Sequence, residues 1–233
     1  MLTDDLARLL KPPVTARWRD IGCVRADART GDLLVRLPTL TTLDLYYIAN
    51  CARLDFLPQL ALLSTLELYC HNGADQWHIP ADALLSSLAL CNGLTELTLT
   101  CGFRSAHWSG LFAKLTKLRK LEICRGELDT LMCFAAGPIT QSLEDLIIQN
   151  LELTLPPAEI SHLYALRRLS HLILNCCFSS AVDAETCDSL SPPTPVLPAL
   201  ANLFLRWRNP DRSCEEVLRR DASFEWMQRR LAQ

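Results

Sequence analysis

The chain has 233 residues, of which 49% are hydrophobic and 21% are charged. This is the composition of a folded globular protein, and it excludes a chain that is disordered throughout. The formal net charge is −3. A protein without an overall positive field lacks the charge that neutralises phosphates, so nucleic acid is excluded as the main ligand.

The N-terminal stretch MLTDDLARLLKPP carries two acids where a signal peptide carries positive charge, and no long apolar run follows it. Polar residues interrupt the apolar stretches well before the ~18 residues that cross a bilayer. The chain has eleven cysteines, an odd number, and no N-x-S/T sequon. These features predict reduced thiols, no membrane contact and a cytoplasmic location.

A six-residue unit of the form Leu-x-x-Leu-x-(Leu/Ile) occurs seven times along the chain. The copies are LTTLDL at 40–45, LSTLEL at 63–68, LTELTL at 94–99, LRKLEI at 118–123, LEDLII at 143–148, LSHLIL at 169–174 and LANLFL at 200–205. Their starts are 23 to 31 residues apart, a regularity that indicates repeats. Trp18, Ile21 and Cys23 occupy the same three apolar positions in residues 17–24 and predict a degenerate repeat that caps the first copy.

An apolar residue also precedes most units by three and by six positions. Three positions before stand Leu37, Leu60, Cys91, Leu115, Thr140, Leu166 and Leu197, and six before stand Leu34, Leu57, Leu88, Phe112, Gly137, Leu163 and Thr194. Apolar residues at every third position fit one face of a helical or 3₁₀ turn, whereas the fourth and sixth positions of the unit alternate like a strand. Most repeats therefore predict helix, turn and strand, and the copies must stack to bury their leucines.

Some segments depart from this pattern. Longer excursions are expected in residues 74–93 and 187–198, where successive units start 31 residues apart. Gly137 and Pro138 replace the apolar residue of the fifth repeat and predict that it has no helix. Pro157 can occupy the first turn of a helix that continues to about Arg168.

Residues 209–233 are expected to close the far end of the stack as a helix. Ser213 and Glu216 form a capping-box pattern at its start. Apolar residues then follow at helical spacing: Val217, Leu218, Phe224, Met227 and Leu231. This apolar stripe predicts a helical cap over the last strand.

The seven units resemble the leucine-rich-repeat family, whose consensus is L-x-x-L-x-L-x-x-N/C-x-L. The resemblance implies an α/β fold: a right-handed leucine-rich-repeat solenoid, or horseshoe, with a parallel concave sheet and convex helices or turns. It implies that residues 1–33 are an N-terminal cap, residues 34–208 seven leucine-rich repeats and residues 209–233 a C-terminal helical cap. The ninth position lacks the family's asparagine, and in this irregularity the chain is similar to the intracellular, cysteine-containing members.

The sequence contains no motif of a catalytic or phosphate-binding site: G-x-G-x-x-G, the P-loop, G-x-S-x-G, H-E-x-x-H and C-x-x-C are all missing. Cys70 and Cys101 occupy the same place in successive repeats, and Cys124 stands near it in the next. A zinc site would need four ligands, whereas small buried thiols pack as apolar groups. Core packing is therefore favoured, and we predict no enzyme, no cofactor, no metal and no small-molecule substrate.

The fifth and seventh positions of each unit are expected to face away from the inward leucines, into the concavity. They form the pairs Asp44/Tyr46, Glu67/Tyr69, Thr98/Thr100, Glu122/Cys124, Ile147/Gln149, Ile173/Asn175 and Phe204/Arg206. The N-terminal pairs are acidic and aromatic, which suits a basic partner. Ile147, Ile173 and Phe204 form an apolar column of the kind that marks interaction sites. All of these residues except Cys124 make up the candidate partner-binding site.

The leading hypothesis is a protein–protein interaction module that binds an unknown protein partner through the concave sheet face. Two alternatives stay open. One is a substrate-recognition adaptor of a ubiquitin ligase, although residues 1–33 show no F-box pattern. The other is a thiol- or metal-dependent enzyme that uses Cys70, Cys101 and Cys124.

Overall fold

The computed structural model describes residues 18–25, 29–46, 54–69, 81–100, 108–124, 130–155, 157–178, 197–208 and 215–220, and the structural statements that follow concern these residues. The strands are β1 (Asp20–Arg25), β2 (Thr42–Tyr46), β3 (Thr65–Tyr69), β4 (Glu96–Thr100), β5 (Lys120–Cys124), β6 (Asp145–Leu155), β7 (His171–Phe178), β8 (Asn202–Arg208) and β9 (Glu215–Arg220). The helices are α2 (Thr30–Leu34), η2 (Leu57–Gln59), α3 (Ala81–Ala89), α4 (Trp108–Phe112), η3 (Met132–Phe134), α5 (Ile139–Ser142) and η4 (Pro157–Ala165), where η marks a 3₁₀ helix.

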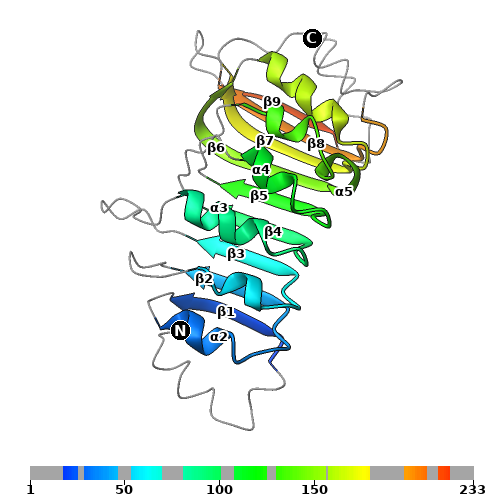
Figure 1. Cartoon of the computed structure of the whole chain (residues 1–233). Coiled ribbons are helices and arrows are strands. Elements are labelled where there is room, and N and C mark those ends of the chain that lie inside the picture. Colours follow the sequence, from blue (N-terminus) through cyan, green and yellow to red (C-terminus); the bar gives the residue numbers. More distant parts are fainter. Residues whose placement is uncertain are drawn as a thin grey trace.

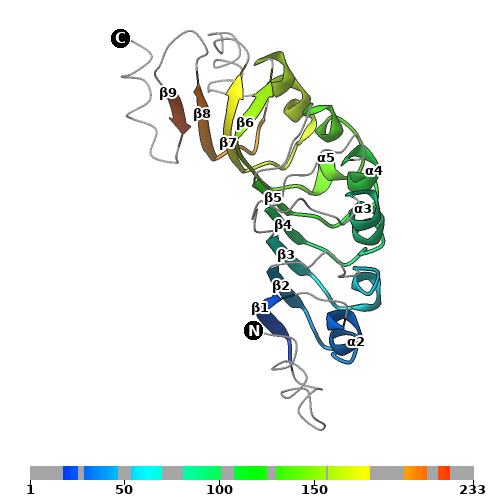
Figure 2. The ribbon, with the colours of Figure 1, turned by 90° about the vertical axis from the view of Figure 1, so that its left-hand side faces the viewer.

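The strands form one open sheet in which each strand lies beside the next one in the sequence (Figure 1). Strands β1 to β8 run parallel, and β9 runs antiparallel to β8. Figure 2 shows the sheet along the inner side of an arc and the helices along its outer side. The architecture is an α/β horseshoe solenoid, as the sequence predicted. Within the described part of the chain, no helix is long and apolar enough to cross a membrane.

The fourth positions of the seven units lie in one row across the sheet. The row consists of Leu43, Leu66, Leu97, Leu121, Leu146, Leu172 and Leu203. These leucines are buried, as are the first positions from Leu40 to Leu200 and the sixth positions from Leu45 to Leu174. The predicted continuous core of inward leucines is therefore confirmed.

In six of the seven units, the apolar residue three positions before the unit lies in a tight turn. The backbone N–H of the first position donates to the carbonyl three residues earlier in the pairs Leu40/Leu37, Leu63/Leu60, Leu94/Cys91, Leu118/Leu115, Leu169/Leu166 and Leu200/Leu197. Such a 3₁₀-type bond brings residues i and i+3 onto the same side of the chain. Both apolar side chains therefore enter the core before the strand begins.

The prediction that the fifth repeat has no helix is wrong. Helix α5 begins directly after Pro138, whose fixed φ suits a helix start. Gly137 precedes it with a φ of +87°, in the left-handed region that glycine adopts at little cost. The turn places Ile139 in the core, one residue before the expected position of Thr140.

Of two other expectations for the convex side, one is met and one is met in part. The nine-residue helix α3 lies in the longer excursion between the second and third units. Pro157 stands at the start of η4, which ends at Ala165, before the expected Arg168. The second excursion, at residues 187–198, lies mostly outside the described residues.

Strand β1 confirms a strand in the degenerate N-terminal repeat. Ile21 is buried and pairs with Leu43. The register then shifts, and Val24 rather than Cys23 lies opposite Leu45. A bulge inserts an extra residue into one strand of a pair, so the alternation expected from Cys23 does not hold in this edge strand.

The predicted C-terminal helix is wrong for Glu215–Arg220, because these residues form β9. The last repeat strand, β8, would otherwise present a row of unpaired backbone N–H and C=O groups. An antiparallel strand satisfies these groups directly, which a packed helix does not. The rest of the predicted apolar stripe, in residues 221–233, lies outside the described residues.

A ladder of hydroxyl groups connects neighbouring repeats where the strands begin. Each second-position carbonyl from Arg19 to Ser170 accepts two backbone N–H bonds from the next repeat, at 2.7 to 3.0 Å. Thr41, Ser64, Thr95 and Ser170 each add a side-chain bond to the preceding second-position carbonyl, at 3.1 or 3.2 Å. These hydroxyls join the repeats at a position where the repeat consensus specifies no residue, so no sequence pattern predicted them.

Candidate protein-binding face

The candidate site is the face of the sheet opposite the buried leucines, on the inner side of the arc (Figure 2). Successive strand residues point to opposite faces, so the third, fifth and seventh positions of each unit share this face. The third positions are Thr42, Thr65, Glu96, Lys120, Asp145, His171 and Asn202. These three columns, together with Asp20 and Gly22 of β1, are called the concave face below.

The sequence-based candidate site covered only the fifth and seventh positions. The structure places both columns on adjacent strands in register, from Asp44/Tyr46 on β2 to Phe204/Arg206 on β8. The third column was missed, although the same alternation that predicts the other two also predicts it. The side chain of Arg206 lies outside the described residues.

Three carboxylates lie together at the N-terminal end of the concave face. Asp44 of β2 lies directly beside Glu67 of β3 in the strand register. On the other side, a Cβ placed on Gly22 of β1 would lie 3.0 Å from the Asp44 Oδ2 atom, so the carboxylate closely approaches the β1 backbone. Burial raises the pKa of Asp44, and repulsion from Glu67 and then from Asp20 raises it further.

No positive side chain of the described residues compensates these three charges. Ion pairs between two described side chains are found at Glu144, Asp145 and Glu159. A carboxylate that is crowded by like charges and partly removed from water is destabilised in its ionised form. Among the described side chains, this end of the concave face therefore carries three carboxylates and no positive partner.

Two stacked tyrosines lie beside the carboxylates. The ring centroids of Tyr46 and Tyr69 are 4.2 Å apart and their planes differ by 11°. The Tyr69 hydroxyl donates a hydrogen bond of 2.6 Å to Glu67 Oε2. Burial, followed by this bond to a carboxylate, raises the pKa of Tyr69, so its hydroxyl keeps its proton. The bond fixes the aromatic pair against the acidic cluster.

The middle of the concave face is polar and more enclosed. Thr98 faces the concavity as predicted, but only 8% of it is exposed, because it lies between the longer side chains of Glu67 and Glu122. Glu122 Oε1 accepts hydrogen bonds from Cys124 Sγ at 3.4 Å and from Gln149 Nε2 at 3.5 Å. Thr98 therefore offers a partner little surface.

The C-terminal part of the concave face is apolar. Ile147, Ile173 and Phe204 are neighbours on β6, β7 and β8, and each is half-buried. In the adjacent column, the Oδ1 atom of Asn175 is enclosed and accepts no hydrogen bond from the described residues. The apolar column that the sequence predicted is thus a contiguous, partly exposed strip.

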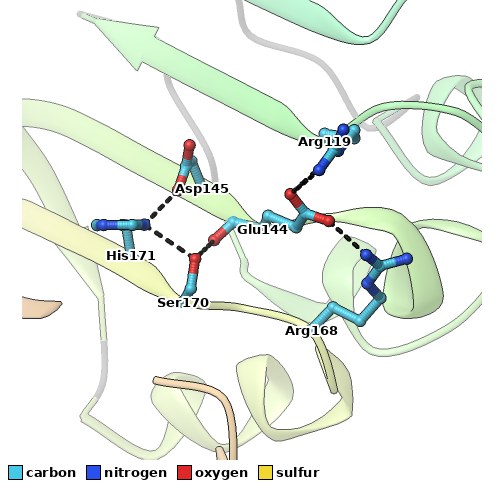
Figure 3. A network of polar contacts seen from close by, with 6 residues as sticks. All are labelled: Arg119, Glu144, Asp145, Arg168, Ser170 and His171. Carbon is cyan, nitrogen blue, oxygen red and sulfur yellow. Dashed lines mark hydrogen bonds and ion pairs between the residues drawn. The ribbon is translucent and has the colours of Figure 1, made fainter. Parts of the chain in front are cut away.

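A polar network borders this strip (Figure 3). His171 Nδ1 lies 2.6 Å from Asp145 Oδ1 and 2.9 Å from Ser170 Oγ, and Ser170 Oγ donates to the Glu144 carbonyl oxygen at 3.1 Å. A Ser–His–Asp catalytic unit needs the serine and the carboxylate on different ring nitrogens. Both contact Nδ1 here, so this arrangement positions His171 and does not activate Ser170.

The same figure shows a bridged pair of arginines at the rim where the strands begin. Glu144 receives Arg119 on Oε2 and Arg168 on Oε1, each at 2.6 Å. The hydrogen bond from Arg119 lowers the pKa of Glu144. Because both arginines are mostly exposed, the bridge contributes little to stability. It leaves positive side chains on the rim beside the negative concave face.

The cysteine sites of the thiol or metal alternative are only partly described. Cys70 and Cys101 lie outside the described residues, so their proximity stays a prediction. Burial raises the pKa of the Cys91 thiol to about 11 and that of Cys133 to about 12, which makes both unreactive. In the described part of the chain, no three His, Cys, Asp or Glu side chains converge to hold a metal ion.

Comparison with models of known protein families gives no match, and neither does comparison with curated proteins. Among solved structures, the chain is similar to TLR13 in a crystal structure of the TLR13–ssRNA13 complex, with a TM-score of 0.50 and 15% sequence identity. The likeness covers 88% of this chain and 34% of that chain. The fold is a leucine-rich-repeat solenoid.

The leucine-rich-repeat solenoid explains how the candidate residues come together. Each repeat contributes one strand, and the inward leucines fix the register between strands. Side chains from distant repeats therefore share one face in fixed columns. The chain spans about a third of the length of the TLR13 chain, and at 15% identity the two have only the fold in common.

Proposed function

We propose that this leucine-rich-repeat solenoid is a protein-interaction module that binds a protein partner through its concave face. The observation that carries the proposal is the contiguous strip of Ile147, Ile173 and Phe204, partly exposed on the same face as the Tyr46–Tyr69 stack. Exposed apolar and aromatic groups in one patch mark interaction sites, and tyrosine is enriched among the residues that dominate binding energy.

The size of the concave face limits the mode of binding. Eight parallel strands at ~4.8 Å spacing and about five residues at 3.3 Å each give a floor of roughly 34 by 17 Å, or nearly 600 Å². Stable interfaces bury about 800 Å² on each partner. The partner therefore also contacts the rim, where Arg119 and Arg168 are exposed, or it binds weakly.

The proposal is tested by affinity purification of partners followed by mass spectrometry, with wild-type protein and two aspartate variants. Ile173→Asp places a charge in the apolar strip, whereas Leu90→Asp places the same charge on a 63% exposed leucine directly after the outer helix α3. We expect Ile173→Asp to lose the specific partner and Leu90→Asp to keep it. The opposite pattern would place the partner on the outer side of the solenoid.

The cysteine content supports a cytoplasmic location for this module. An odd number of eleven cysteines suits reduced thiols better than a disulfide framework. Thiol titration of the denatured, unreduced protein is expected to give close to eleven thiols per chain. A count near zero would contradict both the reduced state and the location.

A further inference from the structure

We infer that the occupant of the concave face is a basic segment of a protein, with lysine or arginine over the Asp44–Glu67 end and apolar side chains over the Ile147–Ile173 strip. This inference rests on the proposed function and specifies the chemistry of the partner. Three observations carry it: carboxylates that have no positive partner among the described side chains, an aromatic pair beside them, and an apolar strip at a fixed distance.

The charge of the described side chains on the concave face favours a positive partner. Carboxylates occupy this face on six successive strands: Asp20, Asp44, Glu67, Glu96, Glu122 and Asp145. The described basic side chains on it are Lys120 and His171, and His171 contacts Asp145. An acidic segment would place like charges opposite each other, which costs binding energy, whereas a basic segment relieves the repulsion within the cluster.

Asp44 identifies where the positive charge is most favourable. It is the carboxylate whose ionised form is disfavoured by burial and by Glu67 and Asp20 on both sides. A lysine or arginine placed against it gains attraction from all three acids at once. The repulsion among the three carboxylates in the unbound face is therefore relieved when the positive group binds.

The stacked tyrosines provide a second contact for the same group. Tyr46 and Tyr69 occupy the column next to Asp44 and Glu67, on the same two strands. An arginine or lysine that reaches a carboxylate here also lies near an aromatic ring, and cations are attracted to such ring faces. The bond from Tyr69 to Glu67 holds the ring in place before a partner arrives.

The spacing along the solenoid defines the pattern of the segment. From Glu67 on β3 to Ile147 on β6 there are three strand spacings, or about 14 Å. An extended peptide covers this distance with about four residues. The segment therefore carries its apolar side chains about four residues from its basic ones, if it lies extended across the strands.

Selection from a displayed library of random peptides tests the inference. The peptides have about 12 residues, because an extended peptide of this length spans the concave face. The purified full chain serves as bait. We expect the enriched peptides to carry an excess of lysine and arginine together with apolar residues about four positions away. Their affinity, measured with synthetic peptides by fluorescence polarisation, is expected to fall as salt concentration rises.

Matched variants of the bait protein show which residues of the concave face contact the enriched peptides. Asp44→Asn and Glu67→Gln are each expected to weaken the enriched peptides about threefold to tenfold. Asp32→Asn removes the same charge from an exposed position on the outer helix α2 and is expected to leave the affinity unchanged. Ile173→Asp is expected to weaken binding, and Leu90→Asp is not.

The outcomes separate this inference from the proposed function. The enriched peptides could lack an excess of basic residues and still fail to bind the Ile173→Asp variant. This result would overturn the inference and leave the concave face as the binding site. Peptides that bind equally to all concave-face variants would overturn both. If no peptide is enriched, the inference of a linear basic segment is rejected, and the partner purification alone decides the proposed function.

Discussion

Leu97 shows how a single core residue connects three repeats. It is fully buried on β4, between Leu66 of β3 and Leu121 of β5 in the same row. Its side chain therefore belongs to the packing of its own repeat and of both neighbours. In a solenoid, each such contact contributes to the interface that holds the stack together.

The first prediction concerns this leucine. Leu97→Ala is expected to lower the free energy of unfolding by about 2 to 5 kcal/mol, because it leaves a cavity between repeats. The matched control is Leu90→Ala, the same change at a side chain that is 63% exposed, for which less than about 0.5 kcal/mol is expected. Chemical denaturation measures both, and equal losses would contradict the assignment of Leu97 to the core.

Asp44, on the concave face, is a residue whose ionised side chain affects the stability of the fold. Because its pKa is raised in the folded protein, its ionised form destabilises the fold, and this cost is present in full above the raised pKa. As the pH falls through the raised pKa, Asp44 takes up a proton and the cost disappears. Below the ordinary value of 3.8, the residue is protonated in both states.

The second prediction follows from that sign. Asp44→Asn is expected to raise the melting temperature at neutral pH, and the difference from wild type is expected to vanish as the pH falls below the ordinary aspartate pKa. Thermal melting across this pH range measures the effect, with Asp32→Asn as the control. A variant that is less stable than wild type at neutral pH would show that Asp44 is a stabilising residue.

At the scale of the element, Gly137 sets the entry into α5. Its φ of +87° is a conformation that side chains rarely adopt. The position is not crowded, because the nearest atom to an added Cβ is the Cα of Ala113 at 3.9 Å. The requirement for glycine is thus one of backbone conformation.

The third prediction compares two glycines. Gly137→Ala is expected to cost about 1 to 2 kcal/mol of stability, because alanine is strained in the left-handed region. Gly110→Ala in α4, where nothing lies within 4 Å of an added Cβ, is expected to be neutral or to stabilise the protein by up to about 1 kcal/mol. A loss of unfolding free energy in Gly137→Ala without a loss in Gly110→Ala, measured by denaturant unfolding, supports the assignment. Equal losses in both variants would refute it.

At the scale of the whole molecule, β9 decides how the solenoid ends. It is antiparallel to β8, whereas the pairs from β1 to β8 are parallel. Antiparallel pairing reverses the chain direction, so it stops the parallel repeat and makes β9 the outermost strand of the described sheet in place of β8. In the described part of the C-terminal segment, the element that adjoins the last repeat is thus a strand, and its capping function stays a prediction.

The fourth prediction is that deletion of residues 213–233 frays the solenoid from β8. Amide hydrogen exchange in Asn202–Arg208 is expected to become faster than in β3 to β5, because β8 loses its pairing with β9. Aggregation is expected to increase because the buried Leu203 loses the strand beside it. Unchanged exchange in β8 and an unchanged aggregation rate would show that β9 is not needed to protect the edge.

The sequence by itself determined the repeat, the eight strands from residue 20 to residue 208 and the inward leucines. These features follow from local periodicity, since apolar residues at every third position and then at alternate positions specify a turn and a strand in each copy. The same alternation determined that Asp44, Tyr69 and Ile173 lie on one face. Burial of the leucine row fixes the register between neighbouring strands, and this register also fixes which residues lie on the opposite face.

Only the tertiary structure decided the features that depend on a neighbouring strand. Residues 215–220 carry a helical pattern, yet they form β9, because the open hydrogen-bonding edge of β8 outweighs a local capping preference. The small side chains of Ser64 and Thr98 reveal nothing about their partners. Stacking alone places the Ser64 hydroxyl against the Thr41 carbonyl and encloses Thr98 between two glutamates. Such contacts join residues more than 20 positions apart, so no local pattern encodes them.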